Sequence, residues 1–430
     1  MSDPKTTAGA ADDFSRQQVP DSATYSGFHI ALVIISGTIA IPAFMMAAQI
    51  GNAIGLSDGI KAFMLGCLVL GSMGALTSYV GSRSRYSTYM LTAFAFGRSG
   101  AKLVNLVIAL VLVGWFGVLG YVFAQAAHQT VLDLFDLSVP LWVFIIIGSG
   151  LKVAVTIAGF KGIDILARFL VPLLALLLGY AAFLSFDKIP SWSAPGGLPT
   201  MTFSIAVSAV IGSYIAGVII QPDYSRFARK ASHALWAAFI ALGVSFPLVQ
   251  FLSAVPSVAT GQHDLIIIMI ALGIGVPAFL LLLLSSWSSN VLCLYSSALS
   301  LSTIFTRAHL WQITLGIGIV GTILALFNVE QYFISFLVLL GVAIPPIAAI
   351  YVLDMFIVRR GNYNEQALAD APAINVGSFA AWGLGILVGY LASENILSLS
   401  GIASIDSILV SSVSYALFKS HHLLAVKSPA

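Results

Sequence analysis

Three serines share one face of a predicted helix in the second half of the chain. Ser285, Ser288 and Ser289 are spaced i, i+3 and i+4 in the stretch LLLLSSWSSNVLCLYSSALS, and residues at these spacings are neighbours on a helix. Their hydroxyl oxygens, together with carbonyls freed where another helix is broken, would suit a small hard cation such as sodium. The alternative is that the serines donate to the preceding turn of their own helix or join two helices.

Two aromatic residues have the chemistry to hold a flat ligand. Trp115, in VLVGWFGVLG, lies deep in an apolar stretch rather than at the interfacial positions where tryptophan is enriched. Together with Tyr214, in GSYIAG, it could sandwich a planar ring, and stacking is worth about 1–3 kcal/mol per base. The amide of Asn290 could read the ring edge, and Ser213 and the backbone at Gly212 could add hydrogen bonds. Packing in a helix bundle is the alternative interpretation of the tryptophan.

The composition places these residues in a membrane protein. Of the 430 residues, 59% are hydrophobic and 8% are charged, whereas a soluble domain carries roughly 25% charged residues. The formal net charge of +2 is too small to suggest a nucleic-acid partner. The two cysteines show no metal-site spacing. Because no nucleophile–base or metal set stands at membrane depth, we do not expect an enzyme.

A membrane-spanning helix needs about 20 mostly apolar residues. Twelve stretches of the sequence qualify, with approximate limits 27–50, 60–80, 103–127, 139–158, 165–185, 203–220, 233–256, 277–303, 309–327, 330–357, 376–392 and 405–419. The basic residues gather in alternate connections, from the one between the second and third stretches onward. By the positive-inside rule, this alternation places both termini in the cytoplasm.

Two of these stretches carry glycine or proline near mid-depth. The first contains ISGTIAIP, with Gly37 and Pro42, and the sixth contains GSYIAG, from Gly212 to Gly217. Such residues leave backbone groups free, which a membrane tolerates only where they face protein or a wet cavity. Paired interruptions five spans apart indicate an inverted-repeat transporter. The alternative is that these small residues only let helices pack closely.

The repeat predicts the domain organisation. We expect a flexible cytoplasmic tail at 1–25, five-helix repeats at 26–186 and 187–358, two further transmembrane helices at 359–420 and a cytoplasmic tail at 421–430. No Asp or Glu lies near mid-span, which favours a neutral substrate and a coupling ion held by neutral oxygens. Lys152 is the one deep charge, and we expect its long side chain to extend to the cytoplasmic surface. A functional role is the alternative.

Several stretches match the pattern of a known family. They are VGWFGV, GSYIAG followed by PDYSRFAR, WSSN with LYSSAL, AIPPI followed by Asp354 and Arg359–Arg360, and TAFAFG. Through them the chain resembles the nucleobase–cation symporter-1 family, and most closely its bacterial cytosine permease branch. The resemblance implies an all-α, LeuT-like integral membrane protein with twelve transmembrane helices, of which the first and sixth are broken. It also implies a bacterial cytoplasmic (inner) membrane and transport by alternating access.

The resemblance further implies a role for each candidate residue. Trp115 and Tyr214 would stack on the base, while Ser213 and Asn290 would form hydrogen bonds with it beside the break that Gly212 allows. The implied sodium site consists of the carbonyls near Thr38 and Ile41 and the hydroxyls of Ser285, Ser288 and Ser289.

The chain also departs from the cytosine permease pattern. That pattern has a phenylalanine at Tyr214, an asparagine at Ser285, a serine at Ala216, polar residues at Val291 and Leu292, and threonines for the serines of the eighth span. These departures remove groups that would read the ring edge, so they concern the substrate more than the family.

The predicted function is sodium-coupled import of a nucleobase, with cytosine as the first candidate, by a monomer in the lipid bilayer. The alternatives are proton coupling, a different purine or pyrimidine, a hydantoin or vitamin precursor as substrate, and an uncoupled channel or facilitator.

Overall fold

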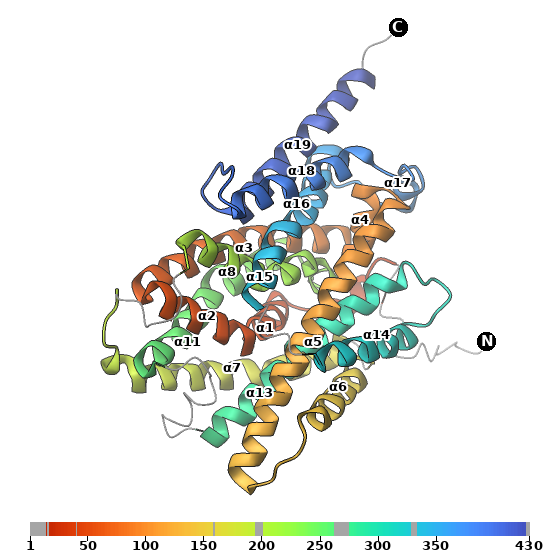
Figure 1. The fold of residues 1–430 in the computed structure, drawn as a ribbon. Helices are drawn as coiled ribbons and strands as arrows, with labels where there is room; N and C mark the ends of the chain where they lie inside the picture. The colour runs from red at the N-terminus through yellow and green to blue at the C-terminus, as the bar shows by residue number, and fades with distance from the viewer. Residues whose placement is uncertain are drawn as a thin grey trace, which may run out of the picture.

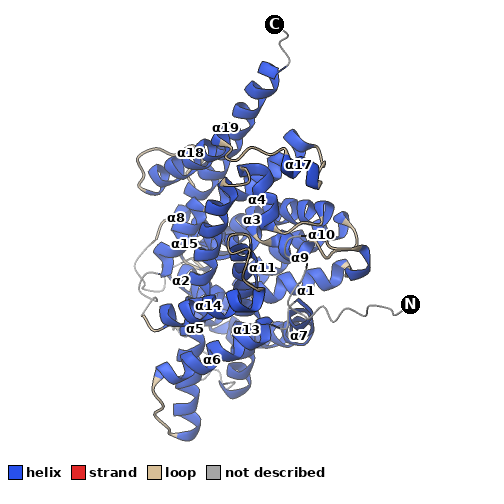
Figure 2. Cartoon of the chain, turned by 90° about the vertical axis from the view of Figure 1, so that its right-hand side faces the viewer, coloured by secondary structure: helices blue, strands red, loops and turns tan. Residues whose placement is uncertain are grey.

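Apolar stretches become helices in this chain because lipid offers no partner for a free backbone N–H or C=O group. The computed structural model describes Phe14 and residues 17–39, 41–157, 160–193, 201–261, 275–327 and 333–426. Within this part of the chain, the extended structure is limited to one isolated β-bridge between Tyr25 and Ala228. Figure 1 and Figure 2 show a bundle of helices that cross one another at varied angles.

Helices of the first half follow the first five predicted spans. Their bounds are α1 (Gly27–Thr38), α2 (Ile41–Ile54), α3 (Leu56–Ser84), α4 (Thr88–Phe96), α5 (Gly100–Phe135), α6 (Leu141–Ile157) and α7 (Phe160–Ser185), with short 3-10 helices at Asp21–Ala23 and Phe186–Lys188. Figure 1 shows α5 running along the molecule from the neighbourhood of α4 to its connection with α6.

Helices of the second half follow the remaining predicted spans. Their bounds are α8 (Phe203–Ile219), α9 (Gln221–Ser225), α10 (Ala231–Phe239), α11 (Phe246–Thr260), α13 (Gly275–Ser302), α14 (Leu310–Ala325), α15 (Phe333–Ala343), α16 (Pro345–Leu353), α17 (Glu365–Ala369), α18 (Val376–Ser393) and α19 (Ala403–Val426). Two π-helices, Ile240–Ser245 and Asp354–Arg359, join α10 to α11 and continue α16. Among the described residues, five continuous helical stretches are long and apolar enough to cross a membrane, and one bent pair adds a sixth.

The first predicted span bends where its glycine and proline stand. Helix α1 ends at Thr38, Ile39 has φ −88° and ψ 77°, and the segment Pro42–Ile54 turns by 59° from α1. The last four carbonyls of a helix have no partner within it. The bend therefore leaves the carbonyls of the last turn of α1 available to other groups in the interior.

The sixth predicted span is interrupted later than the sequence suggested. Helix α8 continues through the predicted break at Gly212 to Gly217 and ends at Ile219, before Pro222 of α9. The Tyr351 hydroxyl donates to the Ile219 carbonyl at 2.9 Å. Side chains of neighbouring helices thus donate hydrogen bonds to carbonyls left free at this helix end. The two glycines allow neighbouring groups to pack closely against α8.

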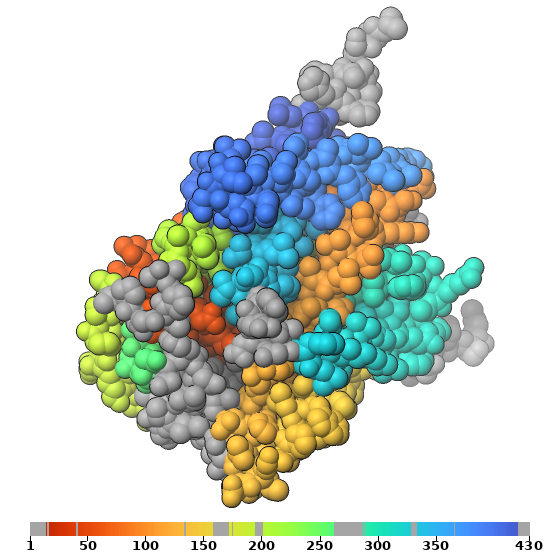
Figure 3. Space-filling model, in the orientation of Figure 1, coloured from red at the N-terminus to blue at the C-terminus, as the bar shows by residue number. Residues whose placement is uncertain are grey.

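Helices α18 and α19 lie side by side at one edge of the molecule and contact α16 (Figures 1 and 2). Figure 3 shows their atoms covering that end of the visible face.

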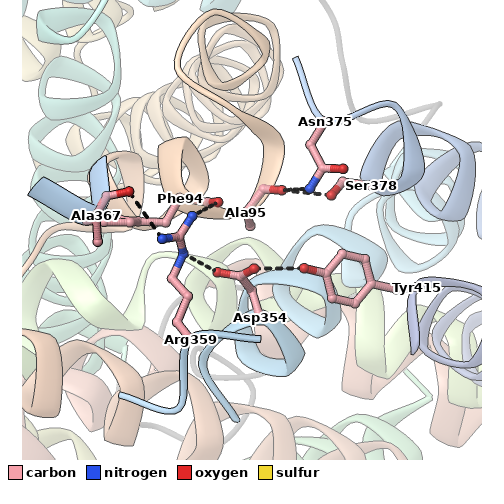
Figure 4. A network of polar contacts seen from close by, with 8 residues as sticks. All are labelled: Phe94, Ala95, Asp354, Arg359, Ala367, Asn375, Ser378 and Tyr415. Carbon is pink, nitrogen blue, oxygen red and sulfur yellow. Dashed lines mark hydrogen bonds and ion pairs between the residues drawn. The ribbon is translucent and has the colours of Figure 1, made fainter. Parts of the chain in front are cut away.

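A buried ion pair anchors these appended helices (Figure 4). The Arg359 Nε lies 3.0 Å from Asp354 Oδ2, and the Tyr415 hydroxyl of α19 donates to the same carboxylate at 2.8 Å. The guanidinium also donates to the carbonyls of Phe94 and Ala367. The π-helix brings residues five apart onto one face, which places Arg359 beside Asp354. Both charged groups therefore have hydrogen-bond partners, as buried charges require.

The end of the predicted flexible tail makes defined contacts. The Gln18 side chain donates to the Ser84 carbonyl at 3.0 Å, and the Val19 amide donates to the Arg85 carbonyl at 3.2 Å. The Arg85 guanidinium lies 3.1 Å from the carboxylate of Asp21. Residues 17–25 are therefore held against the end of α3, while residues 1–13 lie outside the described chain.

Lys152 does not extend to the surface, contrary to the prediction. Its side chain is fully buried, its Nζ has no hydrogen-bond partner among the described residues, and the ammonium lies 4.0 Å from the centroid of the Phe123 ring. Helices α5, α13 and α14 all contact α6, so the lysine is surrounded before it can reach the interface. The sequence indicates how deep Lys152 lies in the membrane, but not toward which neighbouring helices its side chain points.

Replacing Lys152 by methionine should stabilise the protein. Burying a charge without a partner is costly, and methionine keeps most of the side-chain volume. Exchanging buried charges for well-packed apolar residues can stabilise by about 1–4 kcal/mol. Thermal unfolding of the purified protein in detergent would measure the change, with Lys61→Met on the exposed face of α3 as the matched control. A lower unfolding temperature for Lys152→Met alone would contradict this account.

Candidate substrate and cation site

A cavity with about 610 Å³ of empty volume lies at the bend between α1 and α2. Its walls come from these two helices and from α5, α8, α9, α11 and α13, with Ile220 between α8 and α9. Small-molecule sites are mostly apolar, with a few placed polar groups. Five predicted site residues line this cavity, namely Thr38, Trp115, Ser213, Tyr214 and Ser289.

Trp115 is held in place by two phenylalanines. Its ring centroid lies 5.5 Å from that of Phe336 and 6.3 Å from that of Phe333, both in edge-to-face arrangements. The residue is 7% exposed, and aromatic pairs in this geometry favour one orientation of the ring. The indole is therefore positioned at the cavity wall before any ligand binds.

Tyr214 bridges α8 and α1. Its hydroxyl donates to the Ile34 carbonyl at 3.3 Å, and its ring packs against Phe246 with centroids 5.6 Å apart. A Cβ atom at Gly37 would lie 2.8 Å from the Tyr214 hydroxyl, and one at Gly217 would lie 2.6 Å from the ring. The two glycines therefore make the room that this tyrosine occupies.

Ser289 joins α13 to the end of α1. Its Oγ lies 3.3 Å from the Ser36 carbonyl oxygen and 3.4 Å from that of Gly37. Both carbonyls belong to the last turn of α1, where the helix dipole is negative and favours a cation. The hydroxyl and the two carbonyls form a compact group of neutral oxygens beside the cavity.

Two predicted substrate contacts lie away from the cavity lining. The Asn290 amide donates to the Phe116 carbonyl of α5 at 3.4 Å, and its Oδ1 is buried without a hydrogen-bond partner in the part of the chain that the structure describes. At Gly212, an added Cβ would lie 1.8 Å from the Leu337 carbonyl oxygen of α15. In this structure Asn290 joins two helices and Gly212 lets α8 and α15 approach, and their contact with a substrate stays a prediction.

Three predicted cation ligands lie outside the described side chains. Ile41 is the first residue of α2, and Ser285 and Ser288 stand on α13, but only their backbone is described. Thr38 is described, and its hydroxyl donates to the Ile35 carbonyl at 2.8 Å.

Some cavity residues were missed by the sequence analysis although a signal existed. Leu119 stands one turn after Trp115, and Cys293 stands one turn after Ser289; both line the cavity. Leu292, which the sequence analysis named as a departure from the family pattern, lines it as well. Residues four apart share a helix face, so each predicted residue could have pointed to its neighbour along the same helix.

Other cavity residues carry no such signal. Phe246 starts α11, and Tyr224 lies in α9, where its hydroxyl donates to the Gly217 carbonyl at 3.1 Å. Their place at the cavity depends on how α9 and α11 pack against α1, which the order of residues does not reveal.

The PDYSRFAR stretch forms a buried polar cluster next to the cavity. The Asp223 carboxylate accepts from the Thr88 amide at 2.9 Å and from the Tyr89 hydroxyl at 2.7 Å. The Arg226 guanidinium donates to the Asp223 carbonyl at 3.0 Å and to the Phe14 carbonyl at 2.7 Å. These bonds tie the end of α8 to α4 and to the N-terminal segment.

The sequence of residues 18–408 matches a family described as "Permease for cytosine/purines, uracil, thiamine, allantoin". The chain belongs to this permease family. The permease is 28% identical to the cytosine permease of Escherichia coli (strain K12) over 409 residues, which are 94% of this chain and 93% of that protein. Its relatives are permeases rather than enzymes, and it is a multi-pass membrane protein.

Solved structures share the fold of the permease. Mhp1, a nucleobase-cation-symport-1 family transporter in a closed conformation with bromovinylhydantoin bound, has a TM-score of 0.84 and 20% identity, covering 96% of each chain. A Na+-coupled sialic acid symporter in its substrate-bound outward-open state has a TM-score of 0.66 and 15% identity, covering 95% of this chain and 94% of that one. The resemblance to the nucleobase–cation symporter-1 family is therefore confirmed, together with a helical, LeuT-like fold.

Proposed function

We propose that the permease is a sodium-coupled symporter that imports a nucleobase, with cytosine as the first candidate, or a related planar heterocycle. The observation that carries this proposal is the position of the cavity. Gly37 and Thr38 line it at the end of α1, and the Ser289 hydroxyl approaches the carbonyls of the same turn. A cavity lined by aromatic residues and a group of neutral oxygens thus share one helix end.

The spacing of these oxygens suits a hard cation. A cation bound at about 2.3–2.6 Å, as Ca²⁺ is, separates neighbouring oxygens of an octahedron by about 3.2–3.7 Å. Sodium is close to Ca²⁺ in size, and the Ser289 Oγ lies 3.3 and 3.4 Å from the two α1 carbonyl oxygens. The oxygens would therefore need little movement to bind sodium. The further proposed ligands are the carbonyls near Thr38 and Ile41 and the hydroxyls of Ser285 and Ser288.

The lining of the cavity supports a neutral and planar substrate. Within the described residues it contains no Asp, Glu, Lys or Arg side chain, so a charged ligand would meet no opposite charge. Trp115 and Tyr214 supply ring faces or edges, and Ser213 supplies a hydroxyl. We propose that these three residues contact the heterocycle.

The finer topology is part of the same proposal. Twelve spans would form two inverted five-helix repeats, 26–186 and 187–358, followed by two further helices, in a monomer. The bend after α1 and the interruption after α8, five predicted spans apart, support this arrangement. Both termini would be cytoplasmic in a bacterial inner membrane, by the distribution of basic residues.

Replacing Trp115 by alanine should weaken heterocycle binding by about 5–150-fold, because base stacking on an aromatic side chain is worth about 1–3 kcal/mol. Trp115→Phe keeps a ring and should lose less. Equilibrium binding of labelled heterocycle to the purified variants would measure both. Equal affinities for wild type and Trp115→Ala would show that the indole only packs.

Uptake into proteoliposomes tests the function itself. Labelled cytosine is offered at constant pH with and without an inward sodium gradient, and competed by a panel of nucleobases, hydantoin and allantoin. We expect sodium-stimulated uptake that one planar heterocycle of the panel blocks. Uptake that responds to a proton gradient and ignores sodium would contradict sodium coupling, and failure of every compound to enter or compete would contradict the substrate class.

A further inference from the structure

The Tyr214 hydroxyl connects the substrate side of the cavity with the cation side. Its ring lines the cavity, and its oxygen lies 3.3 Å from the Ile34 carbonyl of α1. A carbonyl has two lone pairs, so Ile34 can accept this bond in addition to a bond within α1.

The bond reaches the turn of α1 that approaches Ser289. A Cβ at Gly37 would lie 2.8 Å from the Tyr214 hydroxyl, so the hydroxyl sits directly against Gly37. The Gly37 carbonyl is in turn 3.4 Å from Ser289 Oγ. A movement of the tyrosine ring would therefore press on, or release, the backbone that supplies the oxygens for the cation.

We propose that the Tyr214 hydroxyl is a positioning group that couples heterocycle binding to sodium binding; this inference rests on the proposed function. A heterocycle packed against the ring would fix the hydroxyl on Ile34 and hold the last turn of α1. The carbonyls of Ser36 and Gly37 would then keep their place beside Ser289. Sodium bound to those carbonyls would hold the same turn and orient the ring, since coupling between two sites is reciprocal.

The nearby tyrosine of the cavity offers a matched comparison. Tyr224 also lines the cavity, but its hydroxyl donates to the Gly217 carbonyl rather than to α1. Its hydroxyl also interacts with that of Tyr214, so its loss removes a polar neighbour of Tyr214 while the bond from Tyr214 to the Ile34 carbonyl remains. Tyr214→Phe and Tyr224→Phe therefore differ in the link to α1 while sharing the same chemical change.

The test is the sodium dependence of heterocycle binding. The affinity of the purified permease for labelled cytosine, or for the panel heterocycle that blocks uptake best, is measured in sodium and in choline. Coupling between sites typically changes affinity by about 5–150-fold. We expect Tyr214→Phe to lose most of the enhancement by sodium, and to lose affinity in choline by a much smaller factor, because the ring remains. Tyr224→Phe should keep that enhancement.

Each contrary result has its own meaning. Full enhancement by sodium in Tyr214→Phe would overturn the coupling role and leave the proposed function intact. An equal loss of affinity in sodium and in choline would make the hydroxyl a substrate contact and also overturn it. A wild type whose binding ignores sodium would overturn both proposals. Thermal unfolding of Tyr214→Phe, expected near that of the wild type, separates a folding defect from loss of coupling.

Discussion

Replacing Gly212 by alanine is expected to abolish transport through loss of stability. The added Cβ would lie 1.8 Å from the Leu337 carbonyl oxygen and 2.6 Å from its carbon. These are backbone atoms that cannot rotate away, so α8 and α15 would have to separate. Overpacking costs about 1–3 kcal/mol and occasionally more, and a backbone clash in a central helix pair belongs at the upper end. Thermal unfolding and uptake would measure the effect.

A second glycine provides the control for this experiment. At Gly316 in α14, an added Cβ meets no atom within 4 Å, so Gly316→Ala should be neutral or stabilise by about 0.5–1 kcal/mol through lower backbone entropy. If Gly212→Ala unfolds like the wild type but binds the heterocycle weakly, position 212 contacts the substrate, as the sequence analysis first suggested. The packing explanation would then be wrong.

Replacing Ser289 by alanine is expected to raise the sodium concentration that half-saturates uptake by about 10–150-fold. The estimate follows from about 1.5–3 kcal/mol for a polar contact with a charged group. Heterocycle binding in the absence of sodium should change little. Initial uptake rates over a range of sodium concentrations would measure the shift.

Ser297 of the same helix is the matched control. Its hydroxyl donates to the Ala109 carbonyl of α5 at 3.3 Å, so it joins two helices away from the α1 bend. Ser297→Ala should leave the sodium dependence unchanged. A sodium dependence in Ser289→Ala equal to that of the wild type would remove this serine from the cation site.

The sequence predicted which elements form because hydropathy and length decide what can be a helix in lipid. It also brought Thr38, Trp115, Ser213, Tyr214 and Ser289 together, and the structure places all five at one cavity. The family motifs contributed to this grouping, because no spacing rule links α1, α5, α8 and α13. Polar and aromatic residues that interrupt separate apolar stretches could be expected to meet at one cavity.

Helix rotation explains the misplaced residues. Successive residues point about 100° apart around a helix of 3.6 residues per turn, so Ser289 and Asn290 cannot face the same cavity equally. Ser289 faces α1 and Asn290 faces α5. Gly212 differs from Ser213 in the same way. A sequence without alignment shows that these residues are neighbours but not which of them turns inward.

The residue at which α8 ends depends on tertiary contacts. Glycine at 212 and 217 weakens a helix in isolation, but α8 keeps its hydrogen bonds there because α15 and the Tyr214 ring fill the adjoining space. The helix ends instead at Ile219, where the Tyr351 hydroxyl donates a hydrogen bond to the Ile219 carbonyl. Such a partner, 132 residues away in sequence, could not be foreseen.

Sodium flux driven by the heterocycle tests symport most directly. Proteoliposomes receive labelled sodium at the same concentration and specific activity on both sides, valinomycin and potassium to dissipate charge, and an inward gradient of the heterocycle that the permease takes up. We predict that internal labelled sodium rises above its starting level in the wild type and does not in Ser289→Ala at the same sodium concentration. Entry of the heterocycle without any net movement of sodium in the wild type would contradict the shared site at the end of α1.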